Sequence, residues 1–321
     1  MCNNYQTYIA MENFNHLPWV TRYTVIGLHY YQNYDFRFED QINVMVGESG
    51  LGKTKILHLL YLTLTGRWMS LSKQMFDFLA IGFRNGTEIG FSKGELEFML
   101  LSDPEIKKVK AQKNAVLNKF MEIESIILSA LQGEVIYFPV YRDLIDDLGL
   151  IGKRFDQARY SNEFSLEEHS EYERIARDIL IPTNLADLFV KIPGNFQSQK
   201  TTILISTCNN YLTGIRMHHD HDNVVRLVNV STDETVDLYQ LSSGEKQIVY
   251  FFLKVFFADT DRVYILFDEP ELSIPIDWQR RLLIDLRKLS PAVFMLVITH
   301  SPFIFDNDLD QLACGINKYK I

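Results

Sequence analysis

The stretch that decides the fold is Gly47-Glu48-Ser49-Gly50-Leu51-Gly52-Lys53-Thr54, which matches the P-loop pattern at every required position. It follows a short apolar run, Ile42–Val46. After it, four apolar residues recur at helical spacing: Leu57, Leu60, Tyr61 and Leu64. Glycines let backbone N–H groups turn inward around a phosphate, and the N-terminus of a following helix adds positive potential. The sequence therefore predicts a strand, a phosphate-binding loop and a helix, with Lys53 reaching the β- and γ-phosphates and the Thr54 hydroxyl binding Mg²⁺.

Two adjacent acids end an apolar strand in Tyr264-Ile265-Leu266-Phe267-Asp268-Glu269-Pro270. A buried strand delivers Asp268 to the edge of the sheet, where it can hold the water shell of Mg²⁺. The side chain of Glu269, one residue later, points in a different direction from that of Asp268 and can polarise an attacking water. His300 follows the next predicted strand and faces the same edge, where a neutral imidazole can hydrogen-bond a γ-phosphate. The alternative is that the acids are solvated strand-end residues and that His300 is structural.

A further motif, Leu241-Ser242-Ser243-Gly244-Glu245-Lys246-Gln247, opens a predicted helix shortly before the acidic strand. Taken alone, it is also compatible with an ordinary serine N-cap followed by an acidic first turn. In the order P-loop, this motif, tandem acids and histidine, it resembles the signature sequence of ABC-type P-loop ATPases. Its Ser-Gly-Glu-Lys form is similar to the branch that contains the SMC, RecF and OLD-like proteins.

The resemblance implies an ATPase that uses ATP and Mg²⁺, with Lys53, Glu269 and His300 as catalytic residues and Thr54 and Asp268 at the metal. In this family the signature serves the nucleotide of a second copy. Ser242, Ser243 and Gly244 would therefore complete the site of the partner in a head-to-tail homodimer with two buried ATP molecules. The segment from Glu271 to Asp277 is similar to the D-loop that runs along the dimer axis.

The expected fold is an α/β ABC-type ATPase head, with a mixed sheet, an antiparallel β subdomain and an inserted helical lobe. We expect residues 1–102 and 201–321 to form the head, and residues 103–200 to form a mainly helical insertion that includes a strand at 135–140. Within the head, Phe76–Phe91 reads as a hairpin that turns at Asn85-Gly86. A helix is expected over 200–215, and a pair of strands over 224–230 and 235–238.

The segment Val135-Ile136-Tyr137-Phe138-Pro139-Val140-Tyr141-Arg142-Asp143 resembles one found in RecF-like and OLD-like ATPases, including ATPase subunits of antiphage systems such as Septu. Arg142 either approaches the nucleotide or the insertion, or forms a surface ion pair. The resemblance implies a regulatory ATPase in antiphage defence that controls a separate effector, such as a nuclease. OLD-type proteins carry a nuclease domain beyond the ATPase head, and we expect the effector to be a separate chain because only 21 residues follow His300. The alternatives are a RecF-like repair ATPase acting directly on DNA and a transporter ATPase. The long insertion and the Ser-Gly-Glu-Lys form oppose the transporter.

Composition sets the broad class of the protein. Of 321 residues, 47% are hydrophobic and 23% charged, which is the balance of a well-cored globular chain. A net charge of −9 opposes a protein that coats nucleic acid over its whole surface, although a local basic groove remains compatible with it. No apolar run has the length of a membrane span, and no signal peptide is recognisable. Three scattered cysteines fit neither a disulfide framework nor a zinc site, so a cytoplasmic location is expected.

Several weaker features leave two interpretations open. Five lysines form a basic helical face that either contacts DNA or is simply solvated: Lys107, Lys108, Lys110, Lys113 and Lys119. A polar cluster either binds a metal or is a solvated loop: His218, His219, Asp220, His221 and Asp222. Tyr30 or Tyr31 either stacks on adenine or belongs to the sheet. Gln74 is the candidate for the Q-loop glutamine by its position in the sequence.

Overall fold

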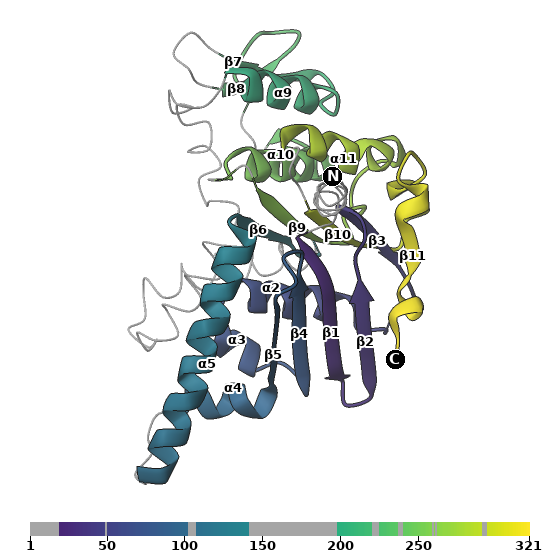
Figure 1. The fold of residues 1–321 in the computed structure, drawn as a ribbon. Coiled ribbons are helices and arrows are strands. Elements are labelled where there is room, and N and C mark those ends of the chain that lie inside the picture. The colour runs from purple at the N-terminus through teal and green to yellow at the C-terminus, as the bar shows by residue number, and fades with distance from the viewer. Residues whose placement is uncertain are drawn as a thin grey trace, which may run out of the picture.

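The structure is a computed structural model. It describes residues 19–48, 50–101, 107–140, 198–219, 225–236, 240–258, 260, 262–290 and 294–321. Within these residues the chain forms two main sheets with helices packed around them, and a small two-stranded sheet at one end (Figure 1). Residues 141–197 of the expected helical insertion, which include Arg142, lie outside the described residues.

The central sheet has five parallel strands in the order β11-β3-β10-β9-β6. Their bounds are Ala313–Gly315 for β11, Ile42–Val46 for β3, Phe294–Thr299 for β10, Val263–Asp268 for β9 and Glu134–Phe138 for β6. Every residue of β9 and β10 is buried. Parallel strands read as continuous apolar runs when both faces of the sheet are covered, and that is why these two segments were recognisable in the sequence.

The side chains of β9 alternate between two hydrophobic cores, one on each face of the central sheet. Tyr264 and Leu266 enter the core that contains helix α2 (Lys53–Leu64) and the antiparallel sheet. Ile265 and Phe267 enter the core that contains helices α9 (Ser198–Asn209), α10 (Ser243–Phe256) and α11 (Ile276–Leu289). Successive side chains of a strand point to opposite faces. The sheet therefore separates the P-loop helix on one face from the helix that carries the signature motif on the other.

The second sheet is antiparallel, with the order β2-β1-β4-β5. Its strands are Val20–Leu28 for β1, Gln32–Arg37 for β2, Phe78–Phe83 for β4 and Glu88–Ser92 for β5. The structure confirms the expected hairpin, because β4 pairs with β5 and Gly86 takes the left-handed conformation of the turn, with φ 81°. This sheet covers the far side of α2.

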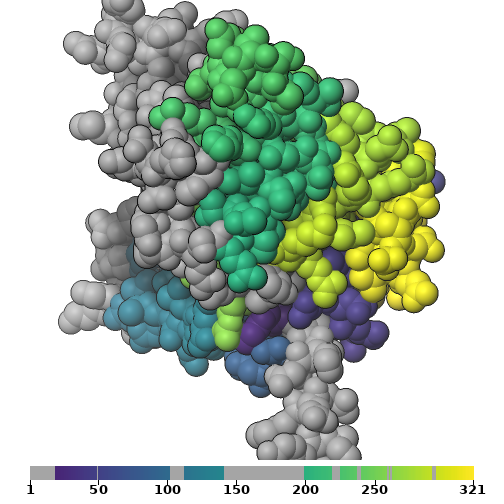
Figure 2. All heavy atoms as spheres, turned by 90° about the horizontal axis from the view of Figure 1, so that it is seen from above, coloured from purple at the N-terminus to yellow at the C-terminus, as the bar shows by residue number. Residues whose placement is uncertain are grey.

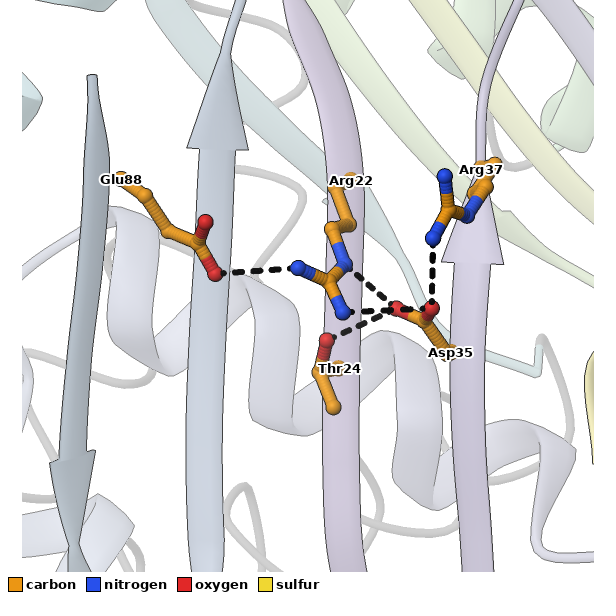
Figure 3. Close-up of polar contacts among 5 residues, drawn as sticks. All are labelled: Arg22, Thr24, Asp35, Arg37 and Glu88. Atoms are coloured by element: carbon orange, nitrogen blue, oxygen red, sulfur yellow. Dashed lines mark hydrogen bonds and ion pairs between the residues drawn. The ribbon is translucent and has the colours of Figure 1, made fainter. Parts of the chain in front are cut away.

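A ladder of charged side chains crosses this sheet (Figure 3). Arg22 of β1 contacts Asp35 of β2 at 2.7 Å and Glu88 of β5 at 3.4 Å. The Thr24 hydroxyl also donates to Asp35, at 2.9 Å. Burial alone would raise the pKa of Asp35, but the hydrogen bonds from Arg22 and Thr24 outweigh it and hold this pKa below its usual value. The ladder helps to hold the register of three strands, although each exposed ion pair contributes little by itself.

The helices form two groups, one on each side of the central sheet (Figure 1). The first group consists of α2 (Lys53–Leu64), α3 (Trp68–Ser72), α4 (Lys93–Leu100) and α5 (Lys107–Leu131). The second consists of α9 (Ser198–Asn209), α10 (Ser243–Phe256) and α11 (Ile276–Leu289). The C-terminal residues add the short helices η2 (Pro302–Ile304), η3 (Asp310–Leu312) and η4 (Ile316–Tyr319). Seen from above, α11 lies between the teal-to-green surface of α9 and the yellow C-terminal residues (Figure 2).

The strand expected at 135–140 was assigned to the helical insertion, and that placement is wrong. It is β6, and it pairs in parallel with β9 at the edge of the central sheet. Ile136 and Phe138 are buried in the core of α10 and α11, whereas Tyr137 enters the core of α2. These apolar side chains find partners on both faces only within the central sheet. The strand therefore belongs to the ATPase head rather than to the insertion.

The helix expected over 200–215 is also shorter than predicted. α9 ends at Asn209, and Ile215 begins strand β7 (Ile215–His219), which pairs antiparallel with β8 (Val225–Asn229). Gly214, with φ 72°, turns the chain, and the Asn209 side chain exchanges two hydrogen bonds with the backbone of Met217. The expected strand at 235–238 is reduced to a single bridge between Thr235 and Val228 among the described residues.

None of the helices within the described residues combines the length and the apolar character that a membrane span requires.

Candidate functional site

The predicted site residues leave three neighbouring strands of the central sheet. In the register of the sheet, Val46 of β3 lies opposite Thr299 of β10, and Ile298 of β10 lies opposite Asp268 of β9. The P-loop follows β3, the tandem acids end β9, and His300 follows β10. Because the strands are parallel, all three segments emerge at the same carboxyl edge, which is where ligands bind in open α/β sheets.

The loop between β3 and α2 has the backbone of an anion cradle. Gly50 and Gly52 have φ values of 88° and 72°, a conformation that favours glycine. Space also demands glycine, because a Cβ on Gly47 would lie 2.6 Å from Ile316 and a Cβ on Gly52 would lie 2.6 Å from Leu28. No side chain caps the N-terminus of α2. Its first N–H groups are therefore available to an anionic ligand.

Lys53 holds its ammonium group inside this loop. The Nζ atom donates hydrogen bonds of 2.8 Å to the carbonyl oxygens of Gly47 and Glu48, and the residue is only 6% exposed. Burial lowers the pKa of Lys53, while the carboxylates of Glu269 and Asp268 oppose that shift. An ammonium group held by loop carbonyls and balanced by carboxylates is suited to neutralise an incoming phosphate. The neighbouring Thr54 is exposed, and Ser49 lies outside the described residues.

The two adjacent acids have different surroundings. Asp268 is the last residue of β9 and is 1% exposed. Glu269 adopts φ 48°, which is unusual for a residue other than glycine, and its N–H donates to the Ile298 carbonyl at 2.8 Å. The side chain of Glu269 is 26% exposed, and its Oε1 atom lies 3.4 Å from Nε2 of His300. The structure thus brings together the two residues that the sequence suggested for polarising water and sensing a γ-phosphate.

Glu271 belongs to the same group, and its contacts were not predicted from the sequence. Its carboxylate accepts hydrogen bonds from the hydroxyl of Thr299 and from the backbone N–H groups of His300 and Ser301. The sequence offered one signal, a third acid separated from the tandem pair only by Pro270. Its partners lie in a segment nearly 30 residues away along the chain, so only the folded structure could identify them.

The signature motif forms the start of α10. The Ser242 hydroxyl accepts from the Glu245 N–H at 3.3 Å, and the Glu245 carboxylate accepts from the Ser242 N–H at 2.9 Å, which makes a capping box. The Ser242 hydroxyl also donates to this carboxylate at 2.7 Å. The N-cap considered as an alternative is therefore present. Ser242 and Ser243 are nevertheless exposed, whereas Gly244 and Glu245 are buried. Two hydroxyl groups and a helix N-terminus thus face away from the core.

Gly244 packs directly on the turn that follows the tandem acids. A Cβ at this position would lie 2.7 Å from the backbone oxygen of Ser273. Ser273 itself has φ 68°. One turn further along α10, Gln247 donates to the carbonyl oxygen of Pro270 at 3.4 Å. Glycine is therefore required at 244 for packing within one chain, whatever else approaches this helix.

Two further candidates lie close to the P-loop and its helix. Gln74 accepts a hydrogen bond of 2.6 Å from Lys55 of α2, so it is tied to the P-loop helix through that lysine. Tyr30 and Tyr31 are 78% and 72% exposed and sit in the β1–β2 turn. Gln32, at the end of this turn, lies 3.3 Å from the position that a Cβ on Gly52 would occupy. The stacking of either tyrosine on adenine stays a prediction.

The basic helical face is only partly described. Lys119 forms an ion pair of 2.6 Å with Glu95, and Lys113 donates to the carbonyl oxygen of Leu101. The side chains of Lys107, Lys108 and Lys110 lie outside the described residues, as do Asp220, His221 and Asp222. Among the described residues there is no group of three metal-ligating side chains of the His, Cys, Asp or Glu type.

The residues present fit MgATP by their chemistry. The glycine loop, the uncapped N-terminus of α2 and Lys53 match a polyphosphate. A hydroxyl and a buried carboxylate, from Thr54 and Asp268, are oxygen ligands of the type that Mg²⁺ takes. Strand order, loop, acids and signature together define an ABC-type P-loop ATPase of the RecF/SMC branch.

The family model described as "AAA domain, putative AbiEii toxin, Type IV TA system" matches residues 138–306. This is more than half of the chain, and the chain belongs to that AAA-domain family. The matched range includes the signature motif, the tandem acids and His300, and it begins after the P-loop.

Among solved structures, the chain is similar to an SMC head bound to the C-terminal winged-helix domain of ScpA, with 12% identity, a TM-score of 0.47 and coverage of 93% of this chain and 94% of that one. An SMC head domain from Thermotoga maritima is 12% identical, with a TM-score of 0.41 and coverage of 92% of this chain and 94% of that one. A third similar structure is an SMC head with an extended coiled coil, bound to the C-terminal domain of ScpA from Pyrococcus furiosus. It is 12% identical, with a TM-score of 0.40 and coverage of 93% of each chain. Since these scores lie below 0.5, the class assignment rests on the topology, the motifs and the family model. No curated protein sequence matches the chain.

Proposed function

We propose that this protein binds and hydrolyses ATP with Mg²⁺, acts as a head-to-tail homodimer and regulates a separate effector protein in antiphage defence. The observation that carries the proposal is the alignment of β3, β9 and β10. It brings the P-loop, the tandem acids and His300 to one edge of a parallel sheet. A hydrolytic site needs a phosphate cradle and a group that activates water, and this edge supports both.

In this mechanism the loop amides and Lys53 would bind the phosphates, and Thr54 and Asp268 would hold the metal. Mg²⁺ would offset the negative charge that develops on the phosphates. Glu269 orients the attacking water and accepts its proton, with His300, 3.4 Å away, donating a hydrogen bond at the γ-phosphate. The buried position of Asp268 and the partial exposure of Glu269 support this division between the two acids.

The exposed start of α10 supports a dimeric site. Ser242 and Ser243 face outward on the signature helix, whose buried residues lie in the core on the opposite face of the central sheet from α2. A helix N-terminus with exposed serines suits a phosphate held by another copy of the chain, although the Ser242 hydroxyl is also bonded to Glu245 within its own chain. Two such contacts related by a twofold axis would make an isologous interface.

The effector and the defence role are supported by the family description, which names a type IV toxin–antitoxin system. Such a system has more than one component. The neighbouring gene is the most direct observation on this point: a nuclease gene beside this one would support the proposal, whereas a permease gene would oppose it.

The primary test is ATP binding and phosphate release by the purified chain and its Lys53→Ala variant. Loss of the ammonium removes the charge that neutralises the β- and γ-phosphates, so we expect ATP binding to fall at least ~100-fold. Lys320→Ala, which changes an exposed lysine near the C-terminus, is the matched control and should retain both properties. Equal ATP binding by Lys53→Ala and the parent would contradict the assignment of the P-loop.

A further inference from the structure

The carboxylate of Glu271 makes three hydrogen bonds to the segment that carries His300. Its Oε1 atom accepts the N–H of His300 at 2.7 Å and the N–H of Ser301 at 3.2 Å. Its Oε2 atom accepts the Thr299 hydroxyl at 2.8 Å. Both oxygens are therefore used on consecutive residues, and hydrogen bonds to an ionised acceptor are stronger than neutral ones.

These bonds fix the backbone of His300 on one side while its imidazole is directed to the other. Thr299 is the last residue of β10 and is fully buried, so the strand gives a firm base to the segment. The His300 side chain is 40% exposed, and its Nε2 atom reaches Glu269 at 3.4 Å. Without Glu271, the His300 N–H would lose its acceptor, whereas the Ser301 N–H would keep the Thr299 hydroxyl oxygen, which accepts it at 3.0 Å.

A second contact joins the same two segments. The Ser301 hydroxyl donates to Gln279 of α11 at 2.6 Å. Gln279 in turn donates to the carbonyl oxygen of Ile274 at 2.9 Å. The turn after the tandem acids and the segment after β10 therefore form one hydrogen-bonded unit, although nearly 30 residues separate them in the sequence.

We propose that Glu271 is a positioning residue for hydrolysis, whose carboxylate sets the place of the His300 imidazole relative to Glu269. The inference rests on the proposed ATPase function. Glu271 acts on His300 through the backbone rather than on the nucleotide. Its removal should therefore slow turnover and leave ATP binding nearly intact.

The kinetic test compares Glu271→Ala and Glu271→Gln with the parent. We expect kcat to fall at least ~10-fold in Glu271→Ala, with ATP affinity within about 3-fold of the parent. Glu271→Gln keeps an oxygen that can accept the His300 N–H, so its loss should be smaller. Asp308→Asn changes an exposed acid in the same C-terminal region and is the control. A large loss of ATP affinity would contradict the proposal, because Glu271 would then act through Lys53, whose ammonium it also influences.

A double-mutant cycle separates positioning from general destabilisation. If Glu271 acts through His300, then Glu271→Ala should lower kcat less than about 2-fold in a His300→Ala background. Losses that multiply in the double variant would overturn the proposal.

Hydrogen exchange gives a readout that does not depend on hydrolysis. In Glu271→Ala, exchange of the amide at residue 300 should rise at least ~10-fold, while the amides of β9 keep the exchange of the parent and report that the fold is intact. Unchanged exchange at residue 300 would refute the positioning contact. Absence of Lys53-dependent hydrolysis in the parent would refute the ATPase proposal instead.

Discussion

The charges around Lys53 show how single residues prepare the site. Its ammonium lies among loop carbonyls, and carboxylates of Glu269, Asp268 and Glu271 are close enough to act on its pKa. Burial disfavours the charged form of the lysine, while the acids favour it. The left-handed backbone of Glu269 adds a local conformational cost of about 1 kcal/mol. Such a cost is expected where the chain must turn sharply to separate two adjacent acids.

Glu269→Gln is the residue-scale prediction for the chemistry. The amide keeps the size and the backbone requirement of Glu269 but cannot accept a proton from water. We expect ATP to bind with the parental affinity and kcat to fall at least ~100-fold, measured by phosphate release under saturating ATP. Hydrolysis at the parental rate would show that another group is the base.

His58 provides a residue-scale prediction for pH. Burial, with the nearby charges of Lys55 and Arg67, lowers the pKa of His58 to about 4, and its ring stacks on Tyr137. The unfolded chain takes up this proton near pH 6.5, before the folded protein does. The free energy of unfolding should therefore decrease as the pH falls from 6.5 to 4.

The matched variant is His58→Gln, which cannot titrate. Thermal unfolding between pH 7 and pH 4.5 should show a smaller loss of Tm in this variant than in the parent. An identical decrease in both proteins would mean that His58 does not contribute to the acid sensitivity.

At the scale of elements, the start of α10 is packed on the turn that follows β9. Gly244 lies against the backbone of Ser273, and Gln247 reaches Pro270. The signature motif and the turn that follows the tandem acids are thus in contact within one chain, although the motif is expected to serve a second chain. A change at Gly244 cannot report on the dimer alone.

Gly244→Ala and Ser243→Arg separate these two effects. The added methyl group at 244 would press on a backbone oxygen, and we expect a loss of about 1–3 kcal/mol in the free energy of unfolding. Ser243 is exposed, so Ser243→Arg should keep the parental Tm while it blocks close approach of a second chain. Denaturant unfolding and light scattering with ATP measure the two outcomes. A stable Gly244→Ala protein would contradict the packing argument.

At the scale of the whole molecule, the central sheet divides the head into two halves. α2 and the P-loop lie on one face, and α10 and α11 lie on the other (Figure 1). In a twofold dimer, the P-loop of one chain would contact the signature motif of the other. The interface of each chain would therefore include residues from both sides of its central sheet. ATP bound between two chains would then control their association.

Light scattering of Glu269→Gln tests this arrangement. With hydrolysis blocked, saturating MgATP should shift the mass from monomer to dimer, and removal of ATP should reverse the shift. Glu269→Gln combined with Ser243→Arg should still bind ATP but remain monomeric. A monomeric Glu269→Gln protein at saturating ATP, in a chain whose parent hydrolyses ATP, would exclude the two-headed site for this protein acting alone.

The sequence alone determined the features that depend on neighbouring residues. The P-loop pattern, the helix after it, the hairpin at Asn85-Gly86 and the apolar strand before Asp268 all follow from turn chemistry and periodicity, which act over a few residues. The order of the motifs along the chain then pointed to the class of protein.

Only the tertiary structure decided the features that depend on pairing between distant segments. The register of β3, β9 and β10, the place of β6 in the central sheet, the contact of Gly244 with Ser273 and the bonds of Glu271 to the His300 segment all join residues far apart in the sequence. Local pattern carries no information on which buried strand pairs with which, because any apolar strand can fill either face of a covered sheet. Long-range packing decides which strands pair, and it brings the Glu271 carboxylate against the backbone of His300.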